Sequence, residues 1–263
     1  MRAFSTISIS QFIIFAAFFL VRILMGNSIH FEFTELNFDT TSVQSVIHSL
    51  FQPYSYAALG ALVILSIYPP ITCMTVTYVF EKTQSPEVLY FLGFLAGCMV
   101  ETLRLCIPLF NLWGGYSDFL IYIGKVVFAG RIITVLSLLF SSVFSADDKI
   151  QEADRNVVIA LAVALVMAAA SAIDTRTILP SIMVRASYHR LFAFVYFFLA
   201  GATVFAFIFN KKIKSMISYV LLFSGYTCLT LSNCIFPSVA GLFLLWVGTV
   251  SYFRGLHTYY LWK

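Results

Sequence analysis

The chain has 263 residues, of which 60% are hydrophobic and 11% are charged, and its mean hydropathy is +0.92. A soluble domain carries about 25% charged residues, so this composition excludes an ordinary soluble protein and indicates an integral membrane protein. The net charge of +4 is spread over short loops, which argues against nucleic acid as a partner and leaves membrane lipids as the expected surroundings.

Apolar segments close to the length that crosses a bilayer, about 20 residues, divide the sequence into eight predicted spans: 11–25, 56–80, 87–112, 118–144, 157–173, 191–209, 216–234 and 239–253. We therefore predict an all-α integral membrane protein, a bundle of about eight transmembrane helices with no soluble domain. The expected parts are an N-terminal anchor at 1–25, an extracytoplasmic cap segment at 26–55 and a seven-helix domain at 56–263.

The first span has two interpretations. Its basic start at Arg2 and its apolar core at 12–21 are typical of a signal peptide. However, no small-x-small cleavage site follows and Arg22 interrupts its end, which favours an uncleaved anchor. In the polar segment that follows, 31–38 alternates like a short strand and 42–51 has helical spacing.

The second span contains Pro69 and Pro70 at its centre. Paired prolines remove two backbone donors and crowd the preceding turn, so this helix is predicted to kink or break. Hydroxyls of Thr72, Thr75 and Thr77 are expected to bond the carbonyls set free. The prolines then form either an ordinary kink or a hinge that lines a site.

The third and fourth spans carry four ionisable side chains: Glu101, Arg104, Lys125 and Arg131. A charge at the bilayer centre costs about 3 kcal/mol on insertion scales, so these groups are expected to face one another, a polar cavity or a ligand. Glu101 and Arg131 lie at matching depth in consecutive spans and are predicted to pair. The third span begins with the helix-start signal Ser85-Pro86-Glu87, and Gly93 and Gly97 form a GxxxG pair that permits close helix approach.

The third and fourth spans carry one acidic side chain, Glu101, and three basic ones. Asp174, at the outer end of the fifth span, is available to offset one of the three positive charges. The seventh span adds a polar stripe that includes Tyr219. The predicted ligand-binding residues are Glu101, Arg104, Lys125, Arg131, Asp174, Tyr226, Thr230 and Asn233, with Pro69 and Pro70 as the hinge. The surplus positive charge favours an anionic small molecule or a lipid headgroup. The alternative is a static ion-pair network, or a snorkelling Lys125 or Arg22 that removes the surplus.

Basic residues are distributed unequally between the two sides of the predicted bundle. With the N-terminus inside, the cytoplasmic side carries Arg2, Lys82, Lys149, Arg155, Lys211, Lys212, Lys214, Arg254 and Lys263, whereas the outside carries Arg176, Arg185 and Arg190. By the positive-inside rule, both termini are predicted to be cytoplasmic and the protein to lie in the cell membrane.

Catalytic and metal signals are weak. The five cysteines and four histidines show no metal-ligand spacing, and no hydrolase, metalloprotease or nucleotide-binding motif is present. We therefore expect no catalytic residue, cofactor or metal. Glu101 as a base with His189 is the pair that an enzyme would use.

Two segments, EKTQSPEVLYFLGFLAG at 81–97 and SVAGLFLLWVGTVSYFRGL at 238–256, together with the order of elements over 56–260, resemble the seven-transmembrane sensor modules of bacterial diverse-intracellular-signalling receptors. The resemblance implies a sensor or ligand-binding module with an outward-facing, anion-preferring pocket. It also implies signalling through a separate cytoplasmic or membrane protein partner. A small secondary transporter for an anionic solute or lipid, and a structural subunit of a membrane complex, are the alternatives.

Overall fold

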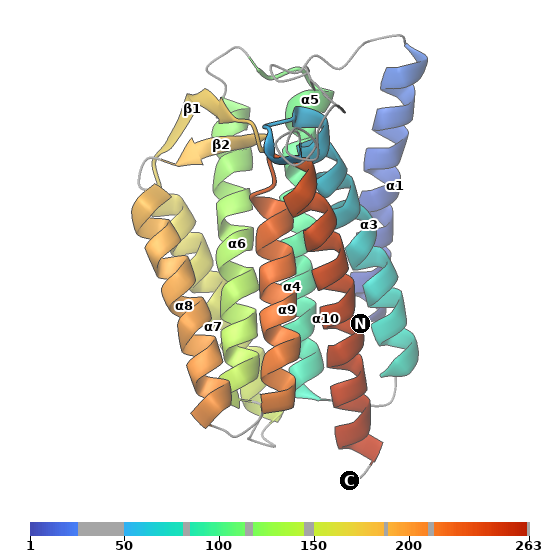
Figure 1. Cartoon of the computed structure of the whole chain (residues 1–263), viewed down its shortest axis with the longest axis vertical. Coiled ribbons are helices and arrows are strands. Elements are labelled where there is room, and N and C mark those ends of the chain that lie inside the picture. Colours follow the sequence, from blue (N-terminus) through green and yellow to red (C-terminus); the bar gives the residue numbers. More distant parts are fainter. Residues whose placement is uncertain are drawn as a thin grey trace, which may run out of the picture.

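A computed structural model describes residues 1–25, 50–80, 85–113, 118–144, 150–186, 189–209 and 213–261. The long helices in these residues are α1 (Arg2–Leu24), α3 (Ser55–Val79), α4 (Pro86–Glu101), α6 (Asp118–Phe144), α7 (Ile150–Ala170), α8 (His189–Phe209), α9 (Ile213–Thr230) and α10 (Ile235–Leu261). They run side by side and alternate in direction, and a β-hairpin covers one end (Figure 1).

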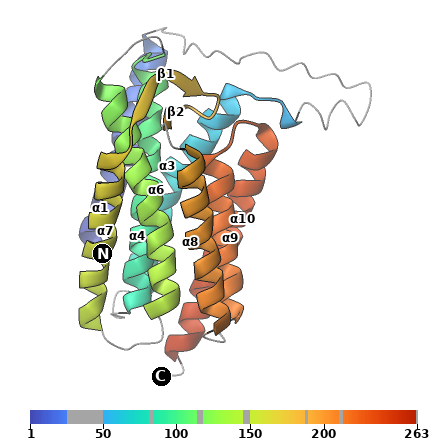
Figure 2. The ribbon, with the colours of Figure 1, turned by 90° about the vertical axis from the view of Figure 1, so that its left-hand side faces the viewer.

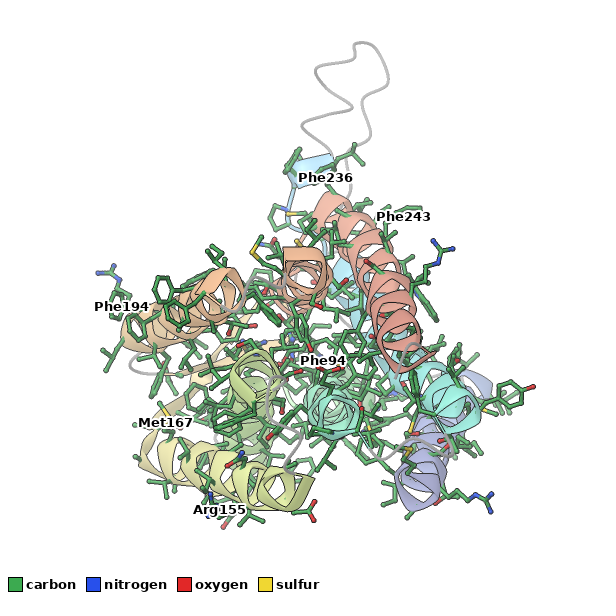
Figure 3. The ribbon with its side chains drawn as sticks, turned by 90° about the horizontal axis from the view of Figure 1, so that it is seen from below. Phe94, Arg155, Met167, Phe194, Phe236 and Phe243 are labelled. Carbon is green, nitrogen blue, oxygen red and sulfur yellow. The ribbon has the colours of Figure 1, made fainter. Side chains whose placement is uncertain are left out.

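The helices present large apolar side chains outward as well as inward. Phe94 of α4 lies at the centre of the bundle and is fully buried, whereas Phe194, Phe236 and Phe243 point away from it at the perimeter (Figure 3). In the described residues, seven helical segments are long and apolar enough to cross a membrane, and the apolar part of α9, Ser215–Thr230, is shorter. The helical bundle expected from the composition is thus present.

Small residues bring α4 and α6 into close contact. A Cβ atom added at Gly97 would lie 2.7 Å from the carbonyl oxygen of Gly130, and one added at Gly130 would lie 2.6 Å from a methyl group of Val100. Both distances are far below van der Waals contact, so the two backbones approach only because both residues are glycine. This confirms the close approach predicted from the glycine pair. At the start of α4, Ser85 accepts a hydrogen bond from the Val88 amide, as the helix-start signal predicted.

Helix α3 runs without a break through Pro69 and Pro70, both of which are buried. The predicted break at these prolines is therefore wrong. The predicted hydroxyl partners are wrong as well: Thr72 and Thr75 donate to the carbonyls of Tyr68 and Ile71, each four residues earlier, and not to those of residues 65 and 66 that the prolines leave without a donor.

The third predicted span is not one α-helix. Helix α4 ends at Glu101, and the chain continues as the 3₁₀ helix η1 (Thr102–Leu105) and the short helix α5 (Cys106–Leu109). Pro108 explains the change, because it has no N–H for the carbonyl of Arg104 and its ring crowds that carbonyl. In a 3₁₀ turn, residues three apart eclipse one another, so Arg104 stacks over Glu101.

Residues 173–186, predicted to be the end of a helix and a loop, form an antiparallel hairpin of β1 (Ile173–Leu179) and β2 (Met183–Ala186). The all-α expectation is corrected in this respect. The turn follows the three-residue pattern with Pro180 in its first position, and the Ile182 amide donates to the Leu179 carbonyl. The hairpin covers the end of the bundle between α7 and α8 (Figure 2).

Helix α1 begins at Arg2, earlier than the predicted Gln11. Gln11 donates to the carbonyl of Met99 at 2.9 Å and to the hydroxyl of Thr102 at 2.6 Å, while Arg22 donates to the carbonyl of Leu109. These bonds fasten α1 to α4 and the turns after it. The strand and helix predicted within 26–49 lie outside the described residues.

Replacing Gly97 with alanine tests the contact between α4 and α6. The added methyl group overlaps the Gly130 carbonyl, and overpacking of this kind costs about 1–3 kcal/mol. Gly60→Ala is the control, because a Cβ atom there meets nothing within 4 Å and alanine improves helix propensity by up to about 1 kcal/mol. We expect Gly97→Ala to lower the melting temperature and Gly60→Ala to keep or raise it. Equal effects would contradict the tight contact.

Candidate functional site

The central polar feature of the bundle is a charge cluster formed by Glu101, Arg104, Arg131 and Tyr226. Glu101 is fully buried at the end of α4, Arg104 is 2% exposed in η1, and Arg131 is 12% exposed on α6. Tyr226 of α9 is also fully buried. Three helical segments therefore meet at one carboxylate.

Glu101 bonds all three other members of the charge cluster. Its Oε1 accepts from Arg131 Nε at 2.5 Å and from the Tyr226 hydroxyl at 3.2 Å. Its Oε2 accepts from Arg104 Nη1 at 2.9 Å and from Arg131 Nη2 at 3.3 Å. The predicted Glu101–Arg131 pair is present, and Arg104 joins it as a second partner.

Arg104 is satisfied mainly by backbone carbonyls. Its Nε donates to the carbonyl of Ile182 at 3.1 Å, its Nη2 to the carbonyl of Ser181, and its Nη1 to the carbonyl of Thr230 at 3.0 Å. Thr230 ends α9, where the carbonyl ends of the helix carry partial negative charge. Arg104 thus ties the hairpin turn to the end of α9, and within the described residues each of its three nitrogens already donates to a protein oxygen.

Ile182 of the hairpin turn has a φ of 56°, a left-handed conformation that is strained for a β-branched residue. The Ile182 side chain is fully buried, and its carbonyl is held by Arg104. Burial and this charged hydrogen bond offset the strain, so the conformation of the turn depends on the charge cluster.

Arg131 has one nitrogen with a weak partner. Its Nε and Nη2 form a fork on Glu101, but Nη1 donates to the thioether sulfur of Met183 at 2.9 Å. A thioether is a weak acceptor, whereas a guanidinium nitrogen forms its strongest bonds with anionic oxygens. Arg131 therefore retains a donor that a carboxylate or phosphate oxygen would satisfy better than Met183 does.

A cavity of about 250 Å³ is lined by residues of α6, α7, the hairpin, α8 and α9, and both Arg131 and Met183 are part of its wall. We call it the upper cavity. Its polar lining side chains are Arg131, Tyr196, Thr227 and Thr230, and the other lining side chains are apolar. A few polar groups in an otherwise apolar wall are typical of ligand sites.

The charge cluster contains one carboxylate and two guanidinium groups, so its formal charge is +1 when all three are ionised. The carbonyls around Arg104 offset part of this charge through their dipoles. An anion in the upper cavity would neutralise the rest at the nitrogen that Met183 contacts.

Three predicted site residues lie apart from the charge cluster. Lys125 is six residues before Arg131 on α6, about 9 Å along the axis and on another face, and it donates to the carbonyl of Ala169 at 3.1 Å. Asp174 is opposite Arg185 in the hairpin and accepts from Thr177 at 3.0 Å. Asn233 follows the end of α9, where its side chain accepts from the Cys234 thiol.

The predicted hinge lies on another side of the bundle. Pro69 and Pro70 border a crevice with Ser8, Gln11 and Thr102, against α1, and neither lines the upper cavity. Tyr226 is in the charge cluster, and Thr230 contributes its carbonyl to Arg104 and its side chain to the cavity wall.

Sequence reasoning missed the hairpin residues Ser181, Ile182 and Met183, and the cavity residues Tyr196 and Thr227. The sequence does contain a signal for the hairpin, because Pro180-Ser181 separates two short runs rich in β-branched residues, at 173–179 and 182–186. Nothing local marks Tyr196 or Thr227, which face Arg131 only through packing.

The site offers hydrogen-bond donors for an anion. In the part of the chain that the structure describes, no group of three or more His, Cys, Asp or Glu side chains is arranged to hold a metal ion. The side chain of His189, the suggested partner of Glu101 in an enzyme, lies outside the described residues.

No protein family and no curated protein significantly matches the chain.

Replacing Glu101 tests the central role of this carboxylate. Glu101→Gln leaves two buried guanidinium groups without a counter-charge, and breaking a buried pair this way costs about 3–5 kcal/mol. Arg131→Gln should cost less, because the Glu101–Arg104 pair remains. The double variant with both Glu101→Gln and Arg131→Gln should lose less free energy of unfolding than the sum of the losses in the two single variants. Chemical denaturation of the purified variants measures all three, and an Arg131→Gln loss as large as that of Glu101→Gln would argue against the shared carboxylate.

Proposed function

We propose that this chain is a multi-pass integral membrane protein with both termini in the cytoplasm, and that it binds an anionic ligand with an apolar body in the upper cavity. The membrane proposal rests on the long apolar helices and their outward-facing phenylalanines. Such side chains gain free energy in hydrocarbon and lose it in water.

The proposed orientation rests on the inequality of basic residues. The hairpin and the C-terminus lie at opposite ends of the bundle (Figure 1). Arg2, Arg155 and Arg254 lie within about two turns of helix ends that point away from the hairpin. The end of the bundle that carries the hairpin is then the extracytoplasmic one.

Reporter fusions test this orientation. We expect a fusion after Asn37 to report an extracytoplasmic position and a fusion after Lys149 a cytoplasmic one, because one predicted span precedes the first point and four precede the second. The reverse pattern would show that the proposed orientation is inverted. If both fusions reported the same side of the membrane, the predicted number of spans between them would be wrong.

The observation that carries the binding proposal is that Arg131 lines an apolar cavity while its Nη1 donates to the thioether of Met183, which lines the same cavity. A ligand oxygen would replace that weak contact with a charge-assisted bond, and the apolar lining would bury the rest of the molecule. Arg104 and Lys125, the anion ligands first expected, do not line the cavity.

A sensor role is favoured by the position of the hairpin. Met183 and Leu179 line the cavity, while Ser181 and Ile182 in the same turn are held by Arg104. A ligand that displaces Met183 from Arg131 would therefore act on the hairpin and, through the carbonyl of Thr230, on α9. The signal would pass to a separate cytoplasmic or membrane protein partner. The unbroken α3 removes one argument for a transporter.

Octanoate, a carboxylate with a short apolar body, tests the binding proposal. We expect it to stabilise the purified protein by about 2.7 kcal/mol at a hundred times Kd, measured by thermal unfolding. Arg131→Gln should weaken binding by about 1.5–3 kcal/mol, the worth of a hydrogen bond to a charged group.

Ala193→Leu should also abolish octanoate binding by filling the upper cavity, and it leaves every residue of the charge cluster unchanged. Ala162→Leu on the exposed face of α7 is its control, since it adds the same side chain away from the cavity. Stabilisation that is the same in all four proteins, or none in the unaltered one, would refute the site.

A further inference from the structure

A second cavity of about 280 Å³, which we call the lower cavity, lies between α6, α8 and α9. It shares Val135 of α6 and Phe197 of α8 with the upper cavity. On α9, the upper cavity is lined at 227–231 and the lower one at 216–224. The two cavities are thus arranged end to end along the helices.

The lower cavity is lined mainly by apolar side chains. Its polar lining residues are already bonded within the protein: Thr203 donates to the Leu199 carbonyl, Ser224 to the Leu221 carbonyl, and the Tyr219 hydroxyl bonds that of Ser141. A polar ligand group there would lose its hydrogen bonds to water without replacement. The polar end of the paired cavities is therefore at Arg131, in the upper one.

The paired cavities are long enough to hold a lipid tail. From Leu231 to Met216 they follow α9 for 15 residues, about 22 Å at 1.5 Å per residue, whereas one leaflet of the bilayer core is about 15 Å deep. A single chain that runs from one cavity into the other would occupy both cavities in this end-to-end arrangement.

The rim of the paired cavities is apolar and open to the perimeter of the bundle. Phe197, Val220 and Leu231 line it and are 57%, 42% and 53% exposed. In a membrane these side chains contact hydrocarbon, so an apolar chain enters between α8 and α9 without crossing water.

We infer that the ligand is a single-chain amphiphile from the membrane, with an ionised carboxylate or phosphate head at Arg131 and an aliphatic tail that passes Val135 and Phe197 into the lower cavity. This inference rests on the proposed function and adds the class of ligand to it. The same Arg131 donor accepts either head, so a fatty acid and a single-chain lipid phosphate are the two sources of this chemistry.

Two photoreactive hexadecanoates test the position of the tail, one with a diazirine at the terminal carbon and one with it near the carboxylate. They are used with the full chain purified in a nonionic detergent, and cross-linked peptides are read by mass spectrometry. We expect the terminal label on lower-cavity residues such as Val204, Phe207 and Met216, and the head-proximal label on Phe192 or Met167.

Gly201→Leu is the blocking variant, because Gly201 lines the lower cavity and a Cβ atom there meets nothing within 4 Å. Gly255→Leu on α10 is the matched control, since its Cβ atom also meets nothing. Gly201→Leu should remove the terminal label from the lower cavity and keep the head-proximal label, whereas Gly255→Leu should change neither. Arg131→Gln should reduce both labels about tenfold or more at low ligand concentration.

Competition with unlabelled lipids shows whether the head of the ligand is a carboxylate or a phosphate. Unlabelled hexadecanoate or hexadecyl phosphate should displace both labels, and the stronger competitor identifies the head. Displacement by a two-chain phosphatidate alone would overturn the single-chain inference. Terminal labels spread over outward residues such as Phe194 and Phe205, with or without octanoate binding, would also overturn it. The proposed function fails instead if octanoate does not stabilise the unaltered protein, or if it stabilises all four proteins of the octanoate test equally.

Discussion

One buried carboxylate joins parts of the chain that are distant in sequence. Glu101 accepts hydrogen bonds from η1, α6 and α9, and through Arg104 it is linked to the hairpin turn. Burying a carboxylate costs several kcal/mol, and the cost is offset only when each of its oxygens is well bonded. The positions of η1, α6, α9 and the hairpin turn therefore depend on the geometry at Glu101, and three of these elements, α6, α9 and the hairpin, line the upper cavity.

The hairpin links the hydrogen-bonded network of Glu101 and Arg104 to the upper cavity. Its turn holds Ile182 in a conformation that β-branched residues avoid, and Arg104 bonds keep it there. Met183, the next residue, contacts Arg131 at the cavity wall. Strained residues of this kind persist where surrounding contacts hold them, and such residues cluster at switch regions. A ligand at Arg131 would compete with Met183 and so act directly on the strained turn.

The contact between Glu101 and Arg131 was predictable because consecutive helices pack as neighbours and depth is counted along a helix at 1.5 Å per residue. Gly93 and Gly97 indicated that α4 approaches another helix closely. Lys125 was wrongly grouped with these residues because it shares a span with Arg131, although it is on another face of α6. Pro69 and Pro70 suggested a break, yet α3 continues through them, because burial among neighbouring helices supports the helix despite two missing hydrogen bonds.

The sequence by itself determined that the chain is a bundle of long apolar helices, since composition and span length need no knowledge of neighbours. It also determined that Glu101 requires a cationic partner, because an unpaired charge among apolar residues is too costly. Only the tertiary structure decided that Arg104 donates mainly to backbone carbonyls. It also decided that Arg131 lines a cavity and has a nitrogen whose partner is a weak acceptor. Those roles depend on where the hairpin turn and α8 pack, and packing is a property of surfaces that meet from distant parts of the chain.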